Sequence, residues 1–294
     1  MTIASAASYS RAHGGRAFVA RQDGVQLLAE GQNGFSLDGV WDIQSGSKTF
    51  WGPVIAELIR EGRIGGYDSL VSDVITEWQS PPLLQQAKKT TTWRAEMSLT
   101  SGHDPGTPGN PVSYERAISS EFNMPAGRVG DFRYGPGPWS VLGMAINRLV
   151  LALGYASPTD YLNKRILSKI GVTVKSWDLI NGNPLQPHLA GGAHIAAKQW
   201  ALFGEYLVNG VVSDLLLAEL VKPVNPLYGI TVWLCLDNDP NKPLPYDGFA
   251  AAGDGNNRLY MFPKLPNNRR LVIARFGVDD PTWSDSEFVK RAVG

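Results

Sequence analysis

The chain has 294 residues, 43% hydrophobic and 18% charged, so it can bury the core of one large domain or of two interlocked ones. Basic and acidic residues each number 27, and this zero net charge gives no support for binding to nucleic acid or to a membrane surface. The single cysteine excludes an intramolecular disulfide, and no stretch is apolar for the length of a transmembrane helix.

The N-terminal third predicts a hairpin followed by a helix. Residues 16–34 read as two strands joined by a turn at Asp23-Gly24, a strong hairpin signal. Apolar residues at three- and four-residue spacing predict a helix over 49–60, which Gly62 ends. A turn and a short helix are expected over 67–75.

The middle of the chain predicts a long loop and then helices. Residues 80–131 are rich in proline, glycine, serine and threonine, and a loop of this length is expected to wall a cleft. Helices are predicted over 139–153, from Pro158 to a stop at Gly171, and over 196–209 before Gly210.

The last third turns to strand character. Residues 228–236, 258–262 and 271–277 are predicted strands, and 281–293 is expected to end in a helix. Strands at both ends with helices between them predict an α+β fold, in which both chain ends form one antiparallel sheet flanked by helices. The expected division is a sheet domain of residues 1–60 and 185–294 and a mainly helical and loop domain of residues 61–184, with the active site at their interface.

The stretch that offers candidate catalytic groups is Ser45-x-x-Lys48, at the start of the first predicted helix. If that helix begins near Ser45, the hydroxyl and the amine share one face, and free backbone N–H groups lie beside the hydroxyl. A desolvated lysine has a lowered pKa and can take the proton that makes serine nucleophilic. On its own, this motif is more often a helix start followed by an exposed lysine.

Further motifs resemble the serine β-lactamase and penicillin-binding-protein superfamily, in its esterase, amidase and nylon-oligomer-hydrolase branch. Ser45-Gly46-Ser47-Lys48 stands where that family has its nucleophile, Leu99-Thr100-Ser101-Gly102 is similar to its T-S-G turn, and Phe132-Arg133-Tyr134 is similar to its F-x-Y segment. Residues 190–204 resemble the family's segment in which two glycines precede a helix. Residues 251–255 stand where the family has K-T-G or a glycine-rich variant. The resemblance covers about residues 16–280, in the family's order.

The resemblance implies an enzyme that forms an acyl-enzyme on Ser45, with Lys48 removing the proton and Tyr134 as base or proton shuttle. It also implies an oxyanion hole made by the Ser45 N–H and a backbone N–H from Gly253, Asp254 or Gly255. Read alone, Tyr134 would be a packed aromatic residue and the 253–255 stretch a glycine-rich hairpin.

Two departures from the family pattern bear on the substrate. Pro136 replaces the asparagine of the family's tyrosine motif, and Ala251 or Ala252 stands where many members have a lysine. Arg258 and Arg275 are alternatives for the missing cation, although solvated strand positions are the better expectation for both. We therefore expect a small ester, or a simple amide, as substrate and little β-lactamase activity.

Two other functions stay open at this point. The scaffold could serve an amidase, a peptidase or an acyltransferase, or it could bind a ligand without catalysis. The four histidines show no metal-ligand spacing, so we expect neither a metal nor a cofactor. The first 15 residues lack the apolar segment of a secretory signal, so we expect a cytoplasmic protein, although a secreted form trimmed of its leader would read the same; the oligomeric state is open.

Overall fold

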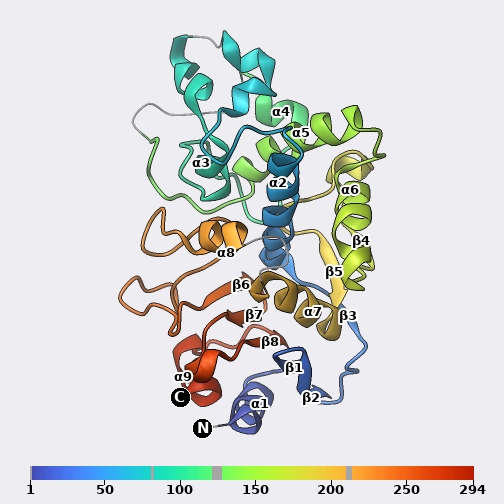
Figure 1. Cartoon of the computed structure of the whole chain (residues 1–294), viewed down its shortest axis with the longest axis vertical. Coiled ribbons are helices and arrows are strands. Elements are labelled where there is room, and N and C mark those ends of the chain that lie inside the picture. Colours follow the sequence, from blue (N-terminus) through green and yellow to red (C-terminus); the bar gives the residue numbers. More distant parts are fainter. Residues whose placement is uncertain (1, 81–82, 121–127, 210–213) are drawn as a thin grey trace. The chain divides into compact units, whose positions relative to one another are not determined.

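The computed structural model describes residues 2–80, 83–120, 128–209 and 214–294 (Figure 1). The chain divides into two compact units. The first contains residues 1–49, 167–176 and 193–294, and the second contains residues 50–166 and 177–192.

A five-stranded antiparallel sheet forms the first unit's centre, in the order β2–β1–β8–β7–β6. Its strands are β1 (Ala17–Gln22), β2 (Val25–Gly31), β6 (Phe249–Gly253), β7 (Asn257–Phe262) and β8 (Leu271–Phe276). The predicted hairpin is confirmed, with Asp23 and Gly24 both at positive φ in its two-residue turn. Because β1 pairs with β8, both chain ends build one sheet, and the predicted α+β class is confirmed.

Helices cover both faces of this sheet, because its residues alternate between two apolar sides. The helices α1 (Ile3–Ala12) and α9 (Asp285–Val293) pack together on one face, over Phe18 and Ala20. The helix α7 (Ala197–Val208) packs against β1, β7 and β8. The predicted helices over 196–209 and 281–293 are thus confirmed, whereas the N-terminal helix was not predicted.

A second, three-stranded sheet has the order β3–β5–β4, from β3 (Val40–Asp42), β4 (Ser176–Trp177) and β5 (Ala193–Ala196). The first unit also contains the helix α8 (Asp214–Val221), the 3-10 helices η5 (Leu167–Ile170) and η7 (Pro266–Asn268), and all but the last residue of the 3-10 helix η1 (Gln44–Phe50).

The predicted strand over 228–236 is wrong. This run is largely buried but forms only isolated bridges, among them Tyr228 with Trp233 and Trp233 with Ala250. Thr231 has φ of 67°, and a left-handed β-branched residue reverses the chain instead of extending it. The neighbouring strand of the sheet is β6, which was not predicted.

Arg275 and Arg258 are not solvated strand residues, contrary to the sequence expectation. Arg275 is fully buried, and its guanidinium donates to Ser10 Oγ and to the carbonyls of His13 and Asn256. Arg258 is half-buried beside Asp285 on α9, with Nε 3.0 Å from the carboxylate. The covering helices α1 and α9, which pack on that face, account for the burial of both.

The second unit is mainly helical. Its helices are α2 (Trp51–Arg60), α3 (Trp93–Met97), α4 (Tyr114–Ile118), α5 (Gly137–Ala152) and α6 (Pro158–Arg165), with 3-10 turns η2 (Val71–Asp73), η3 (Thr76–Gln79), η4 (Leu83–Thr90) and η6 (Ile180–Gly182). Gly62, at φ of 69°, ends α2 as predicted. The predicted 80–131 loop holds α3, α4 and η4, and its residues 81–82 and 121–127 lie outside the described residues.

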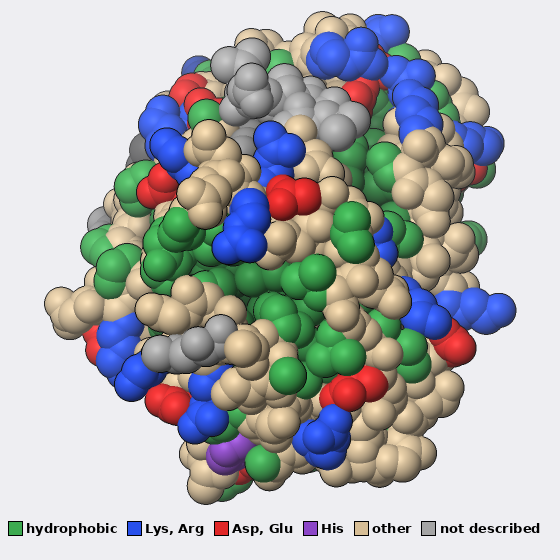
Figure 2. Space-filling model, turned by 60° about the horizontal axis from the view of Figure 1, so that its bottom comes forward, with side chains coloured by type: hydrophobic (Ala, Val, Ile, Leu, Met, Phe, Trp, Pro, Cys, Tyr) green, Lys and Arg blue, Asp and Glu red, His purple; other side chains and the backbone are tan. Residues whose placement is uncertain are grey.

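Charges of both signs are interspersed over the face drawn in Figure 2. Within the ranges that the structure describes, no helix has both the length and the apolar character needed to cross a bilayer.

Candidate active site

The serine and the lysine of the motif lie on a 3-10 helix, η1 (Gln44–Phe50), which leads directly into α2. A 3-10 helix has three residues per turn, so side chains three positions apart lie directly above one another. The Lys48 amine accordingly donates a hydrogen bond to Ser45 Oγ at 2.8 Å. The sequence predicted this shared face from an α-helix, and the structure provides it with a 3-10 helix instead.

Burial changes the chemistry of Lys48. The Lys48 side chain is 2% exposed, whereas Ser45 is only partly buried and remains accessible. Burial penalises the charged ammonium and lowers the pKa of Lys48 from 10.5 to about 7. At neutral pH roughly half of such an amine is neutral, compared with fewer than about one in a thousand for an ordinary lysine. The alternative of an exposed lysine at a helix start is therefore wrong.

The chain just before Ser45 has an unusual backbone conformation. Gln44 has φ of 50°, a left-handed conformation that is uncommon for a residue other than glycine. Asp42, at the end of β3, accepts the Gln44 N–H at 2.7 Å and the Gln44 side-chain amide on its second carboxylate oxygen. Asp42 thus holds the turn from which Ser45 emerges, a role that the sequence reading did not assign.

Two neighbours of Ser45 anchor η1 to the rest of the first unit. The buried Ser47 Oγ accepts a hydrogen bond from the Ala193 N–H at 3.0 Å, which ties η1 to β5. A Cβ at Gly46 would lie 2.7 Å from the Trp200 ring on α7, so this position has no room for a side chain. The glycine and the second serine of the motif therefore serve packing.

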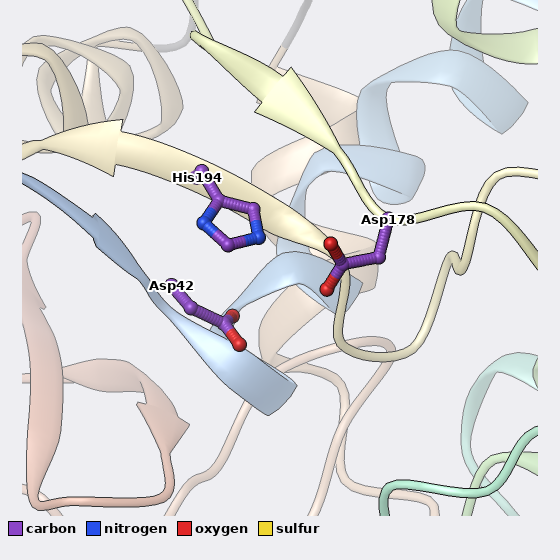
Figure 3. A group of neighbouring side chains, drawn as sticks. All are labelled: Asp42, Asp178 and His194. Atoms are coloured by element: carbon purple, nitrogen blue, oxygen red, sulfur yellow. The ribbon is translucent and has the colours of Figure 1, made fainter.

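Asp42 and His194 are register partners on the antiparallel strands β3 and β5, and Figure 3 shows both side chains. Carboxylate and imidazole are metal-ligand types. Both oxygens of Asp42 nevertheless accept hydrogen bonds from Gln44, so this carboxylate already has a structural role. The other labelled residue, Asp178, belongs to the second unit, where its N–H donates to the Gly192 carbonyl at 2.8 Å.

The predicted oxyanion stretch, 253–255, lies beside the segment that carries Ser45. A Cβ at Gly253 would be 2.0 Å from the Ile43 carbonyl oxygen, so only glycine permits this backbone approach. The Gly255 N–H donates to Asp279 at 3.0 Å and is therefore engaged. Of the stretch predicted to supply an oxyanion donor, Gly253 and Asp254 are the stronger candidates.

Tyr134 belongs to the second unit and lies in an irregular segment just before α5. The Arg133 N–H donates to the Leu99 carbonyl at 2.9 Å, and Gly135 lies so close to Pro105 that a Cβ would be 2.1 Å from its carbonyl oxygen. The T-S-G turn and the F-x-Y segment, about thirty residues apart, are thus brought together as neighbours. Tyr134 is partly buried, and its ring lies 6.4 Å from that of Phe132.

Comparison with solved structures identifies the fold. A hydrolase with promiscuous acyltransferase activity matches with a TM-score of 0.74 at 13% identity, over 99% of each chain. A D-stereospecific amidohydrolase from Streptomyces matches with a TM-score of 0.68 at 18% identity, over 99% of this chain and 98% of that one. The octameric penicillin-binding protein homologue from Pyrococcus abyssi matches with a TM-score of 0.70 at 16% identity, over 98% of this chain and 76% of that one.

The chain has the β-lactamase and penicillin-binding-protein fold. No protein-family model and no curated protein sequence matches it. The fold assignment from sequence motifs is therefore confirmed by structural likeness alone.

Proposed function

We propose that this protein is a serine hydrolase that cleaves small carboxylic esters through an acyl-enzyme on Ser45. The observation that carries the proposal is the buried Lys48 amine, 2.8 Å from Ser45 Oγ and with a pKa of about 7. A neutral amine at that distance can accept the hydroxyl proton as Ser45 attacks the ester carbonyl. The Ser45 N–H, in the first turn of η1, and an N–H from Gly253 or Asp254 would hold the oxyanion.

Tyr134 is proposed as the third catalytic residue, which passes a proton to the leaving group. Its place in the F-x-Y segment, held by the T-S-G turn, supports this role. We expect Tyr134→Phe to lower kcat by roughly 100-fold or more, the usual range for loss of a general acid–base group. Unchanged kcat in a folded Tyr134→Phe variant would remove Tyr134 from the mechanism.

Ester substrates are favoured over β-lactams because the strand beside the nucleophile offers no cation at the family's lysine position. Ala251 and Ala252 occupy it on β6, and Arg258 and Arg275 are engaged with Asp285 and with the N-terminal segment. An amide substrate or acyl transfer is the second candidate, since an amidohydrolase and a hydrolase with acyltransferase activity share the fold. A non-catalytic binding function does not account for the desolvated Lys48 amine beside the Ser45 hydroxyl.

Covalent labelling of Ser45 and turnover of an ester substrate test the proposal. A fluorophosphonate should add to Ser45, as shown by mass spectrometry of the peptide, and hydrolysis of p-nitrophenyl butyrate should disappear in Ser45→Ala. Wild-type turnover in Ser45→Ala would refute the proposal. A panel of esters, amides and acyl acceptors, followed by product analysis, would then separate the ester hydrolase from the amidase and the acyltransferase.

A further inference from the structure

Asn257 is a buried polar residue at the start of β7, directly after the turn that contains the candidate oxyanion donors. Its side chain is the hub of three hydrogen bonds. Nδ2 donates to the Asp254 carbonyl at 2.8 Å and to the Asp42 carbonyl at 3.2 Å, and Oδ1 accepts the Gly277 N–H at 3.2 Å. All three partners are backbone groups of the first unit.

These bonds join two sheets. Asp42 ends β3 of the three-stranded sheet, whereas Asp254 and Gly277 follow β6 and β8 of the five-stranded sheet. The same junction contains the close approach of Gly253 to Ile43. Asn257 therefore fixes the distance between the segment that leads into Ser45 and the 253–255 turn.

We propose that Asn257 is a positioning residue that sets the geometry of the oxyanion hole. The inference depends on the proposed function, because it assigns Asn257 to the alignment of the Ser45 N–H with a donor of the 253–254 backbone. A displacement of about 1 Å in such a site costs roughly 100-fold in rate. Asn257 does not touch substrate, and its effect is transmitted through the Asp42 and Asp254 carbonyls.

The neighbouring Asn256 offers a matched control in the same turn. Its Nδ2 donates to the carbonyls of Val278 and Asp280 at 3.2 and 3.3 Å, and it makes no side-chain bond to β3 among the described residues. Its φ of 54° suits glycine, so Asn256→Gly removes two hydrogen bonds without backbone strain. This variant weakens the turn without releasing it from Asp42.

The experiment compares Asn257→Ala, Asn257→Asp and Asn256→Gly. Asn257→Asp keeps the side-chain size and the acceptor for Gly277, but an ionised carboxylate cannot donate to Asp42 and Asp254. We expect both Asn257 variants to lower kcat on p-nitrophenyl butyrate by about 10- to 100-fold, with KM within about twofold of wild type. Phosphonate labelling of Ser45 should slow by the same factor, since the tetrahedral phosphonyl oxygen occupies the oxyanion hole.

Two further readouts separate positioning from stability. The pH at which kcat/KM is half-maximal should not move in Asn257→Ala, because this variant adds no charge and Asn257 makes no bond to Lys48 among the described residues. Asn256→Gly should keep kcat within about twofold of wild type. Rates are normalised to the folded fraction, measured by circular dichroism. If Asn257→Ala does not fold, Asn257→Asp provides the test of kcat.

The outcomes distinguish the two proposals. If Ser45→Ala abolishes turnover while folded Asn257→Asp keeps wild-type kcat, the positioning role is refuted and the serine hydrolase stands. An equal loss of kcat in Asn256→Gly would also refute it, because the effect would then be general loosening of the turn. If Ser45→Ala retains turnover, the hydrolase proposal itself fails.

Discussion

Replacing Lys48 by methionine should stabilise this protein and inactivate it at the same time. The side chain is 2% exposed, and burial lowers its pKa from 10.5 to about 7. Below pH 7 the amine is charged in both the folded and the unfolded state, so folding bears the whole desolvation cost. At about 1.36 kcal/mol for each pKa unit, that cost is about 5 kcal/mol.

The sign of the pH dependence follows from proton binding. Between pH 7 and 10.5 the unfolded chain keeps the Lys48 proton while the folded protein releases it. Wild-type stability due to this group therefore rises with pH across that window. The gain in free energy of unfolding from Lys48→Met should therefore be several kcal/mol larger at pH 7 than at pH 10.

Urea unfolding of both proteins at pH 7 and pH 10 measures this difference, because the titration of every other group cancels between wild type and variant. Lys198→Met is the matched control, since the Lys198 side chain is 40% exposed beside Asp38 and folding does not bury it. Equal stabilisation by Lys48→Met at both pH values would refute the argument that Lys48 is neutral near pH 7. In activity, kcat/KM should rise through about pH 7 in wild type and fall by at least about 100-fold in Lys48→Met.

Two other predictions test packing and buried hydrogen bonds. Gly46→Ala should lower the free energy of unfolding by about 1–3 kcal/mol, because its Cβ would lie 2.7 Å from the buried Trp200 ring. Gly65→Ala is the control: its Cβ would have its nearest contact at 3.5 Å, so the free energy of unfolding should change by less than about 0.5 kcal/mol. Arg275→Leu should cost about 3–5 kcal/mol in urea unfolding, because it leaves the partly buried carbonyls of His13 and Asn256 without the donor that the buried arginine provides. A cost under about 1 kcal/mol would show that the arginine is dispensable.

Sequence reasoning succeeded where structure is decided locally. The Asp23-Gly24 hairpin, the β7 and β8 strands and the α7 helix follow from turn chemistry and from the period of apolar residues. It failed for β6, whose three consecutive alanines have low strand propensity and become a strand by pairing with β7. It failed again over 228–236, where one left-handed threonine overrides an apolar run.

The candidate site shows the same limit. The three-residue spacing predicts that Ser45 and Lys48 meet, because helix geometry alone brings them together. The contribution of Asn257 depends on its contact with Asp42, 215 positions away along the chain. An aspartate two residues before a left-handed residue is a turn signal that could have indicated Asp42, whereas nothing local distinguishes Asn257 from Asn256.

Two costs of folding lie within five residues at the candidate site. Gln44 has a strained left-handed backbone, and Lys48 is an amine removed from water. Each opposes folding, and whole-protein stabilities are only about 5–15 kcal/mol. The bonds from Asp42, Ser47 and Asn257 hold this segment in place, although a relaxed helix start with an exposed lysine would need none of them. Strain and desolvation beside one accessible hydroxyl support the acyl transfer proposed for Ser45, because perturbed groups of this kind cluster at functional sites.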